Sequence, residues 1–291
     1  MRYEKFMAVS RWGSDAFRQS CTAAGREALA MLRQATLLHR DVLSSPVQLP
    51  RMAHKTDLVV LLHGLFATAG VLRPLRERIE AETSAFTLSF TYAPGTSVQA
   101  LAERVESLLG TVQGTQRIHL VGHSLGGLAV RWYVQEKVYD PRVVQTICLA
   151  SPFAGSRHAR LMPGSSGRDL LPGSALLRQL QEKAPHVDLP HLSLCGANDL
   201  LIERGAWLEC GEHREFPGLG HNGILYDPSV IAEVVARVGS WNSDRDQVRS
   251  SHLRVVAERG PLDVPQVERW SSREELEREL SERPARVSSG R

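Results

Sequence analysis

The chain has 291 residues, of which 42% are hydrophobic and 23% are charged, and its formal net charge is +3. Because a single hydrophobic core stops growing at roughly 250–300 residues, this length predicts one large domain with terminal additions. No stretch approaches the roughly 20 apolar residues that cross a bilayer, and the arginines are dispersed along the chain, which argues against a membrane-spanning protein and against a nucleic-acid partner.

Three regions differ in composition. Residues 1–50 form an extension with a helical pattern that ends in a proline-containing linker, and residues 51–240 alternate short apolar runs with helical stretches. Residues 241–291 carry many charges of both signs and few apolar side chains, so they can bury little surface. We therefore expect an N-terminal helical extension, a central α/β domain that carries the chemistry, and a charged C-terminal extension that is peripheral or partly disordered.

The N-terminal extension has the pattern of an amphipathic helix. Its apolar residues recur at alternating steps of three and four, and the stripe includes Ala24, Ala28, Met31 and Ala35, with arginines on the opposite face. The small side chains of the stripe favour close packing on the central domain. The basic face would also suit an anionic membrane surface, so both interpretations stay open.

The central region has the signature of βαβ units, which form a mostly parallel sheet. The predicted strands are residues 57–63, 86–92, 117–122, 144–150 and 191–196. An amphipathic helical stripe covers residues 98–109, and His213 is expected to begin a further strand. The last helix should start with Asp227 as its cap and Pro228 in its first position, and it should end at Gly239.

The most informative segment is the strand that runs into Gly122-His123-Ser124-Leu125-Gly126. The pattern G-x-S-x-G is weak alone, but here an apolar strand precedes it and a helical pattern follows it. A serine on such a turn adopts strained backbone angles and presents its hydroxyl at the carboxyl edge of the sheet. Ser124 is therefore the candidate nucleophile. The N–H of Leu125, at the start of the helix, is a candidate donor to an oxyanion, whereas His123 is expected to be packed rather than catalytic.

A second signal lies upstream, where an apolar strand ends in His63-Gly64-Leu65. A strand that ends in His-Gly at the same sheet edge can place the backbone N–H of Leu65 as a second oxyanion donor. The alternative is a tight turn that needs Gly64 only for its geometry. The downstream serine turn favours the functional interpretation.

A nucleophilic serine needs a general base, usually a histidine held by a carboxylate, and in this type of sheet the chain order is Ser, Asp or Glu, then His. His221 lies in a glycine-rich loop just before the last helix, and Asp199 follows a predicted strand 22 residues earlier. These two are the candidate base and acid, with Glu203 as the reserve acid. The other downstream histidines are expected to be surface or structural residues: His158, His186, His191, His213 and His252.

Together these segments resemble bacterial triacylglycerol lipases and related esterases of the α/β-hydrolase fold. The resemblance covers roughly residues 57–239 and rests on segments 63–65, 122–133, 150–156 and 220–223. It implies a mostly parallel central sheet with helices on both faces and a lid inserted after the strand that ends near Ala150. It also implies a triad of Ser124, Asp199 and His221, with oxyanion donation by the Leu65 and Leu125 amides.

The resemblance further implies hydrolysis of a carboxylic ester with an apolar acyl chain, through an acyl-enzyme on Ser124 and without a metal or cofactor. The same groups would serve an amidase, a thioesterase, a phospholipase or an acyltransferase, and the motifs leave these open. A non-catalytic scaffold that binds a lipid or a partner is less well supported, because every element of the triad has a candidate. No obligate protein partner is inferred.

The segment 157–190 is the expected lid, because its leucines are interspersed with glycines and prolines, which suits a mobile apolar cover. The alternative is an inserted helix that completes the core. The residues expected to line the lid or the substrate pocket are Phe66, Phe153, Leu161, Leu170, Leu171 and Leu176.

The first residues, Met1-Arg2-Tyr3-Glu4-Lys5, lack the apolar segment of a secretory signal. We therefore expect a cytoplasmic protein, with peripheral membrane contact as a further possibility.

Overall fold

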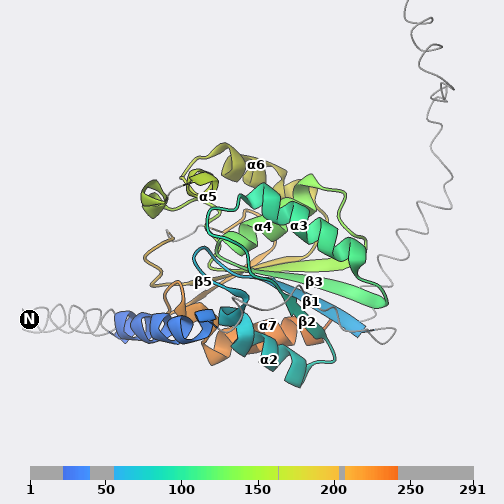
Figure 1. Cartoon of the computed structure of the whole chain (residues 1–291), viewed down its shortest axis with the longest axis horizontal. Coiled ribbons are helices and arrows are strands. Elements are labelled where there is room, and N and C mark those ends of the chain that lie inside the picture. Colours follow the sequence, from blue (N-terminus) through green and yellow to red (C-terminus); the bar gives the residue numbers. More distant parts are fainter. Residues whose placement is uncertain (1–21, 40–55, 163, 203–206, 242–291) are drawn as a thin grey trace, which may run out of the picture. The chain divides into compact units, whose positions relative to one another are not determined.

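The computed structural model describes residues 22–39, 56–162, 164–202 and 207–241 (Figure 1). The chain divides into two compact units, Met1–Ser240 and Trp241–Arg291, and all but one of the described residues belong to the first. The predicted charged C-terminal extension, the linker near residue 50 and the reserve acid Glu203 lie outside the described residues.

Within these described ranges, six parallel strands form one sheet in the order β2-β1-β3-β4-β5-β6. They are β1 (Thr56–Leu62), β2 (Phe86–Ser89), β3 (Thr115–His123), β4 (Val143–Leu149), β5 (His191–Gly196) and β6 (Glu212–Phe216). The direction of strand addition reverses between β1 and β3, which pair along their length. In open parallel sheets, ligands bind outside the carboxyl ends of the strands at such a reversal. The segments that follow β1 and β3 are therefore the first place to look for a site.

Helices cover both faces of the sheet, as Figure 1 shows, and this confirms the predicted fold class. One face carries α3 (Val98–Thr111), α4 (Leu125–Glu136), α5 (Gly164–Asp169) and α6 (Ala175–Lys183), and the other carries α2 (Arg73–Glu82) and α7 (Pro228–Gly239). Short 3₁₀ turns connect them: η2 (Ala69–Leu72), η3 (Arg157–Leu161), η4 (Ala184–His186) and η5 (Gly223–Leu225). Because both faces are covered, residues 58–62 of β1 are all fully buried, as the continuous apolar run predicts.

The last helix begins as the sequence predicts. The carboxylate of Asp227 accepts hydrogen bonds from the backbone N–H groups of Ser229 and Val230, and Pro228 occupies the first helical position. Val234 and Val238 of this helix are buried in the hydrophobic cluster on the face of the sheet that α2 and α7 cover. The helix is thus fixed at its N-terminus, directly after the loop that holds His221.

The edge strand β6 differs from the interior strands in its side chains. Four of its five residues, Glu212, His213, Arg214 and Glu215, are exposed. The strand is held by its parallel ladder with β5 and by ion pairs to α7, Arg214 with Glu233 among them. The strand therefore lacks the alternation of apolar and polar residues that marks a half-buried strand. From the sequence, only a strand that begins at His213 was expected.

The insertion between β4 and β5, where a lid is expected, contains α5 and α6, and much of it belongs to the core. Leu170 and Leu176 are buried in the same cluster as Leu125 of α4. The side-chain amide of Gln135 on α4 donates to the carbonyl of Leu180 at 2.8 Å, which fixes α6 on α4. Leu161 is instead 86% exposed.

The N-terminal segment is helical over the described residues 22–38, but the predicted packing face was wrong. Ala24, Ala28, Met31 and Ala35 are exposed, whereas Ala23 and Ala30 are buried. The reason is that the docked face lies on another side of the helix and combines small, polar and apolar side chains. Its partly buried positions are Glu27, Gln34, Leu37 and Leu38.

Within the part of the chain that the structure describes, no helix combines the length and apolarity that crossing a bilayer requires.

Candidate active site

Ser124 lies at the sharp turn between β3 and α4, with a left-handed backbone conformation (φ 52°, ψ −120°). The turn brings α4 so close to the sheet that a Cβ on Gly126 would lie 2.5 Å from the carbonyl oxygen of Leu62, and a Cβ on Gly122 would lie 2.4 Å from the backbone of Gly126. Only glycine fits at these two positions. The N–H of Ser124 donates to the carbonyl of Leu149 at 2.9 Å, which ties the turn to the end of β4.

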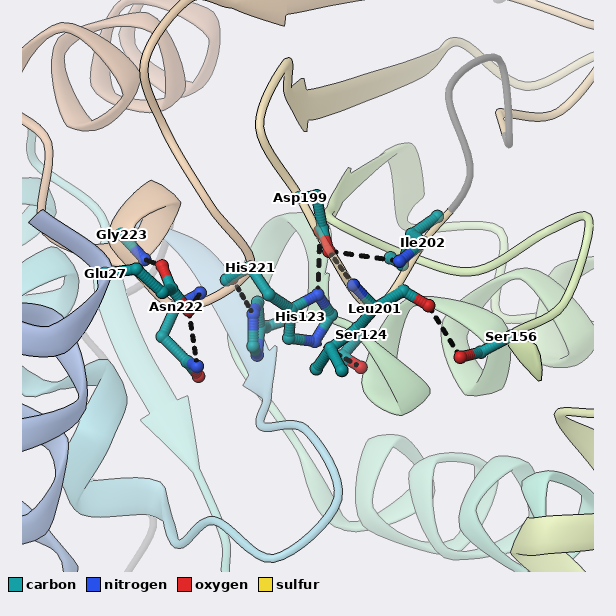
Figure 2. A network of polar contacts seen from close by, with 10 residues as sticks. All are labelled: Glu27, His123, Ser124, Ser156, Asp199, Leu201, Ile202, His221, Asn222 and Gly223. Atoms are coloured by element: carbon teal, nitrogen blue, oxygen red, sulfur yellow. Dashed lines mark hydrogen bonds and ion pairs between the residues drawn. The ribbon is translucent and has the colours of Figure 1, made fainter. Parts of the chain in front are cut away.

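Three side chains that the sequence singled out meet at this turn (Figure 2). His221 Nε2 lies 3.0 Å from Ser124 Oγ, and His221 Nδ1 lies 2.8 Å from Asp199 Oδ2. The side chains of His221 and Asp199 are only 10% and 5% exposed. A carboxylate can only accept, so Nδ1 carries the proton and Nε2 is free to accept from the serine hydroxyl. This is the hydrogen-bond order that activates a serine.

The carboxylate of Asp199 is fixed by backbone donors on its other oxygen. Oδ1 accepts from the N–H groups of Leu201 at 2.8 Å and Ile202 at 3.1 Å, which leaves Oδ2 for His221. The hydroxyl of Ser156, at the start of the insertion, donates to the carbonyl of Leu201 at 2.6 Å. Figure 2 shows this chain of bonds from the insertion to the acid loop. The acid is thus oriented by its own loop.

His63 holds the loop that follows β1. Its Nε2 accepts from the N–H of Tyr92 at 3.3 Å, so its Nδ1 carries the proton and donates to the carbonyl of Gly64 at 2.7 Å. The C=O and N–H of a trans peptide point in opposite directions, so this bond turns the N–H of Leu65 away from His63. Gly64 itself is packed on the serine turn, because a Cβ there would lie 3.0 Å from Ser124 Cβ.

His123 is packed, as expected, and it also supports the base. Its Nε2 donates to the backbone carbonyl of His221 at 3.0 Å, and the two rings lie 5.0 Å apart. Burial, reinforced by the neighbouring His221, lowers the pKa of His123 to about 3. Burial likewise lowers the pKa of His63 to about 4. Both imidazoles are therefore neutral and act as fixed hydrogen-bonding groups.

The other candidate residues lie in different environments. Leu125 is the first residue of α4, where N–H groups lack an intrahelical acceptor. Phe66, on the loop after β1, has a left-handed backbone and is 56% exposed, whereas Phe153 is buried against the ring of His191. Leu171 is partly buried at the rim of the core. Oxyanion donation by Leu125 and pocket lining by Phe66, Phe153 and Leu171 stay predictions.

Sequence reasoning missed the support around His221. Glu27, on the N-terminal helix, accepts hydrogen bonds from the backbone of Asn222 and Gly223. Its separation of 195 residues from Asn222 is beyond any local pattern. The contact of Ser156 with the acid loop was missed for the same reason.

The fold resembles those of several solved hydrolase structures. Lipase B of Aspergillus fumigatus is 17% identical with a TM-score of 0.54, and the match covers 65% of this chain and 54% of the lipase, so this chain spans about half of that protein. The mature lipase BlEst2 of Bacillus licheniformis is 14% identical with a TM-score of 0.51, and the match covers 66% of this chain and 96% of the lipase. No curated protein sequence matches the chain.

The parallel sheet with helices on both faces, and the likeness to these solved structures, show that the chain has the α/β-hydrolase fold. The resemblance to lipases and esterases of this fold is thereby confirmed. Within the fold, the family described as palmitoyl protein thioesterase matches residues 58–186, which is less than half of the chain. The matched stretch contains the His63 loop and the Ser124 turn but ends before Asp199 and His221.

The neutral, buried His63 makes folding stability sensitive to acid. Its folded pKa of about 4 lies below the ordinary value of 6.5, so the unfolded chain takes up the proton first as the pH falls from 6.5 toward 4. Stability is fully present above pH 6.5 and is lost across that window. Because each pKa unit corresponds to 1.36 kcal/mol, His63→Asn should reduce the loss between pH 6.5 and 5 by about 2 kcal/mol.

Urea unfolding of both proteins at several pH values measures this difference. The exposed His158, replaced by Asn, is the matched control and should leave the wild-type pH dependence unchanged. The same pH dependence in His63→Asn and wild type would contradict the assignment of His63 as a buried neutral group.

Proposed function

We propose that this protein is a serine hydrolase that cleaves carboxylic esters with an apolar acyl chain. The observation that carries the proposal is the continuous series of hydrogen bonds from Asp199 through His221 to Ser124, at the reversal point of the sheet. The relatives of similar fold include lipases, which supports an ester as the substrate. The chemistry needs only side chains and backbone amides.

The reaction starts when Ser124 Oγ attacks the ester carbonyl carbon and its proton passes to His221 Nε2. The carbonyl oxygen becomes an oxyanion, which the backbone N–H groups of Leu65 and Leu125 stabilise. The C–O bond to the alcohol then breaks, and His221 gives its proton to the departing oxygen. Asp199 stabilises the imidazolium between these two transfers. Water, deprotonated by His221, then attacks the acyl-enzyme and releases the acid and free Ser124.

An apolar acyl group suits two of the side chains that are predicted to line the lid or the substrate pocket. The ring of Phe66 stands exposed on the oxyanion loop, and Leu161 is exposed on the insertion. When an acyl chain covers such side chains, the apolar surface removed from water stabilises the complex by about 25 cal/mol per Å². We propose that they contact the acyl chain while Leu170 and Leu176 support the insertion from inside.

A thioester is the second candidate substrate. The match to the palmitoyl protein thioesterase family across the His63 loop and the Ser124 turn favours it. The same triad would attack a thioester carbonyl and expel a thiol in place of an alcohol. The acyl part of the substrate would remain apolar under either proposal.

We also propose that the protein contacts the anionic cytoplasmic surface of a membrane through the N-terminal helix. Leu29, Met31 and Leu32 are 68%, 58% and 66% exposed, which is unusual for large apolar side chains on one helix. Arg26 and Arg33 are exposed on the same helix. Apolar side chains that insert and arginines that meet anionic headgroups are the features of peripheral membrane helices.

Ser124→Ala removes the nucleophile and should lower kcat for p-nitrophenyl butyrate by at least about 10³-fold while the fold is kept. Loss of covalent labelling by a fluorophosphonate probe, with an unchanged urea midpoint, checks the site and the fold together. Ser193→Ala, in the interior of β5, is the matched serine control and should still be labelled. Near wild-type turnover in Ser124→Ala would refute the assignment.

Matched pairs of esters and thioesters with acyl chains of increasing length distinguish the two substrates. We expect kcat/KM to rise with acyl length, because each buried methylene contributes about 0.8 kcal/mol. If the protein is an esterase, the ratio of kcat/KM to the uncatalysed rate constant should be higher for the ester than for the thioester with the same acyl chain. A preference for the thioester above about tenfold, or 1.4 kcal/mol, would assign the protein as a thioesterase instead.

Co-sedimentation with vesicles tests the membrane contact. Wild type should sediment with vesicles that contain phosphatidylserine and less with pure phosphatidylcholine, because the arginines require anionic headgroups. Replacing Leu29 and Leu32 by Ser should weaken sedimentation, and Val138→Ser, at an exposed apolar residue after α4, is the control. Equal sedimentation of all three proteins would rule out this helix as the contact.

A further inference from the structure

The carboxylate of Glu27 binds the backbone on the C-terminal side of His221. Oε1 accepts from the N–H of Asn222 and from its side-chain amide, both at 2.8 Å, and Oε2 accepts from the N–H of Gly223 at 2.9 Å. Figure 2 shows Glu27 reaching the loop from the N-terminal helix. Hydrogen bonds to an ionised acceptor are roughly twice as strong as those between neutral groups.

The loop is shaped for this carboxylate. A Cβ on Gly220 would lie 2.5 Å from Glu27 Oε2, so glycine at that position lets the carboxylate approach the loop closely. The residues on both sides of His221 therefore contact the same side chain. A second contact lies six residues further along the helix, where the guanidinium of Arg33 lies 4.9 Å from the ring centre of Tyr226.

One peptide group connects Glu27 with the candidate base. The carbonyl of His221 and the N–H of Asn222 belong to the same planar unit. His123 donates to its oxygen at 3.0 Å, and Glu27 accepts from its N–H at 2.8 Å. Bonds at opposite ends of a peptide plane fix its rotation, and this rotation sets the direction in which the His221 side chain leaves the backbone.

We propose that Glu27 is a positioning residue for the general base, so that the N-terminal helix aligns His221 with Ser124. This inference rests on the proposed function, in which His221 takes the serine proton. Glu27 touches no reacting atom and acts through the peptide of His221. The alignment therefore comes from a segment that precedes β1 and lies outside the stretch matched by the thioesterase family.

The loop has further bonds that would keep it folded without Glu27. The N–H of Asn198 donates to the carbonyl of Leu219 at 2.9 Å, and the 3₁₀ turn η5 closes with the N–H of Tyr226 donating to Gly223. Loss of Glu27 should thus loosen the His221 peptide without removing the loop from its place.

Steady-state kinetics on Glu27→Ala and Glu27→Gln test the proposal with p-nitrophenyl butyrate. Misplacement of a catalytic group by about 1 Å can lower a rate 10²-fold, so we expect kcat to fall about tenfold in Glu27→Ala, with KM within about twofold of wild type. Glu27→Gln keeps one acceptor oxygen but sets an amide donor against an N–H. Its kcat should therefore lie between those of wild type and Glu27→Ala. Glu77→Ala, which removes an exposed glutamate paired with Arg73, is the matched control and should retain wild-type kcat.

Two further measurements separate positioning from a loss of folding. Hydrogen exchange at the amides of Asn222 and Gly223 should accelerate in Glu27→Ala while the strands stay protected. The rate of fluorophosphonate labelling at Ser124 should fall in parallel with kcat. If Glu27→Ala does not fold, the same readouts apply to Glu27→Gln.

The outcomes are distinguishable. Wild-type kcat and labelling rate in both Glu27 variants would overturn the positioning role, as would a rise in KM with unchanged kcat. Absence of labelling in the wild type would overturn the proposed function instead, and hydrogen exchange would still report whether Glu27 holds the loop.

Discussion

The left-handed backbone of Ser124 is the constraint on which the rest of the site depends. A residue held at φ 52° costs of order 1–3 kcal/mol and persists only because its surroundings leave no alternative. Here the surroundings are the close approach of α4 to β1 at Gly126 and the bond from the Ser124 N–H to the end of β4. Because its backbone is fixed, Ser124 cannot move to compensate for a misplaced His221. The accuracy of the site must therefore come from the loops that approach it.

Those loops are oriented by hydrogen bonds that involve backbone groups. Asp199 is oriented by two N–H groups of its own loop, His63 by Tyr92 and Gly64, and the His221 peptide by His123 on one side and Glu27 on the other. A hydrogen bond fixes direction as well as distance, which suits a series of proton transfers between atoms about 3 Å apart. Because His63 and His123 stay neutral, they supply this order without adding charge next to the base.

The parts of the site that have local signals could be predicted from the sequence. Ser124 stands between an apolar strand and a helix, and Asp199 and His221 each follow the end of a strand, so chain order alone placed them at one sheet edge. Glu27 could not be predicted, because its partners are 195 and 196 residues away and its helix docks through a face other than the predicted stripe. The same helix carries an exposed stripe that looks like a packing face in the sequence. Leu161 and Leu170 are equally apolar in the sequence, yet one is exposed and the other buried, since only the fold of the insertion separates them.

The two edge strands of the sheet have different features that disfavour pairing with a strand of another molecule. An edge strand presents unpaired backbone groups that can recruit a strand from another molecule, and proteins prevent this with short strands or with charged side chains. The strand β2 has four residues, and β6 carries exposed glutamates and an arginine. Where many copies of the chain gather at high local concentration, the edges of neighbouring sheets meet often. The charges of β6 keep those encounters from turning one sheet into a longer, shared one.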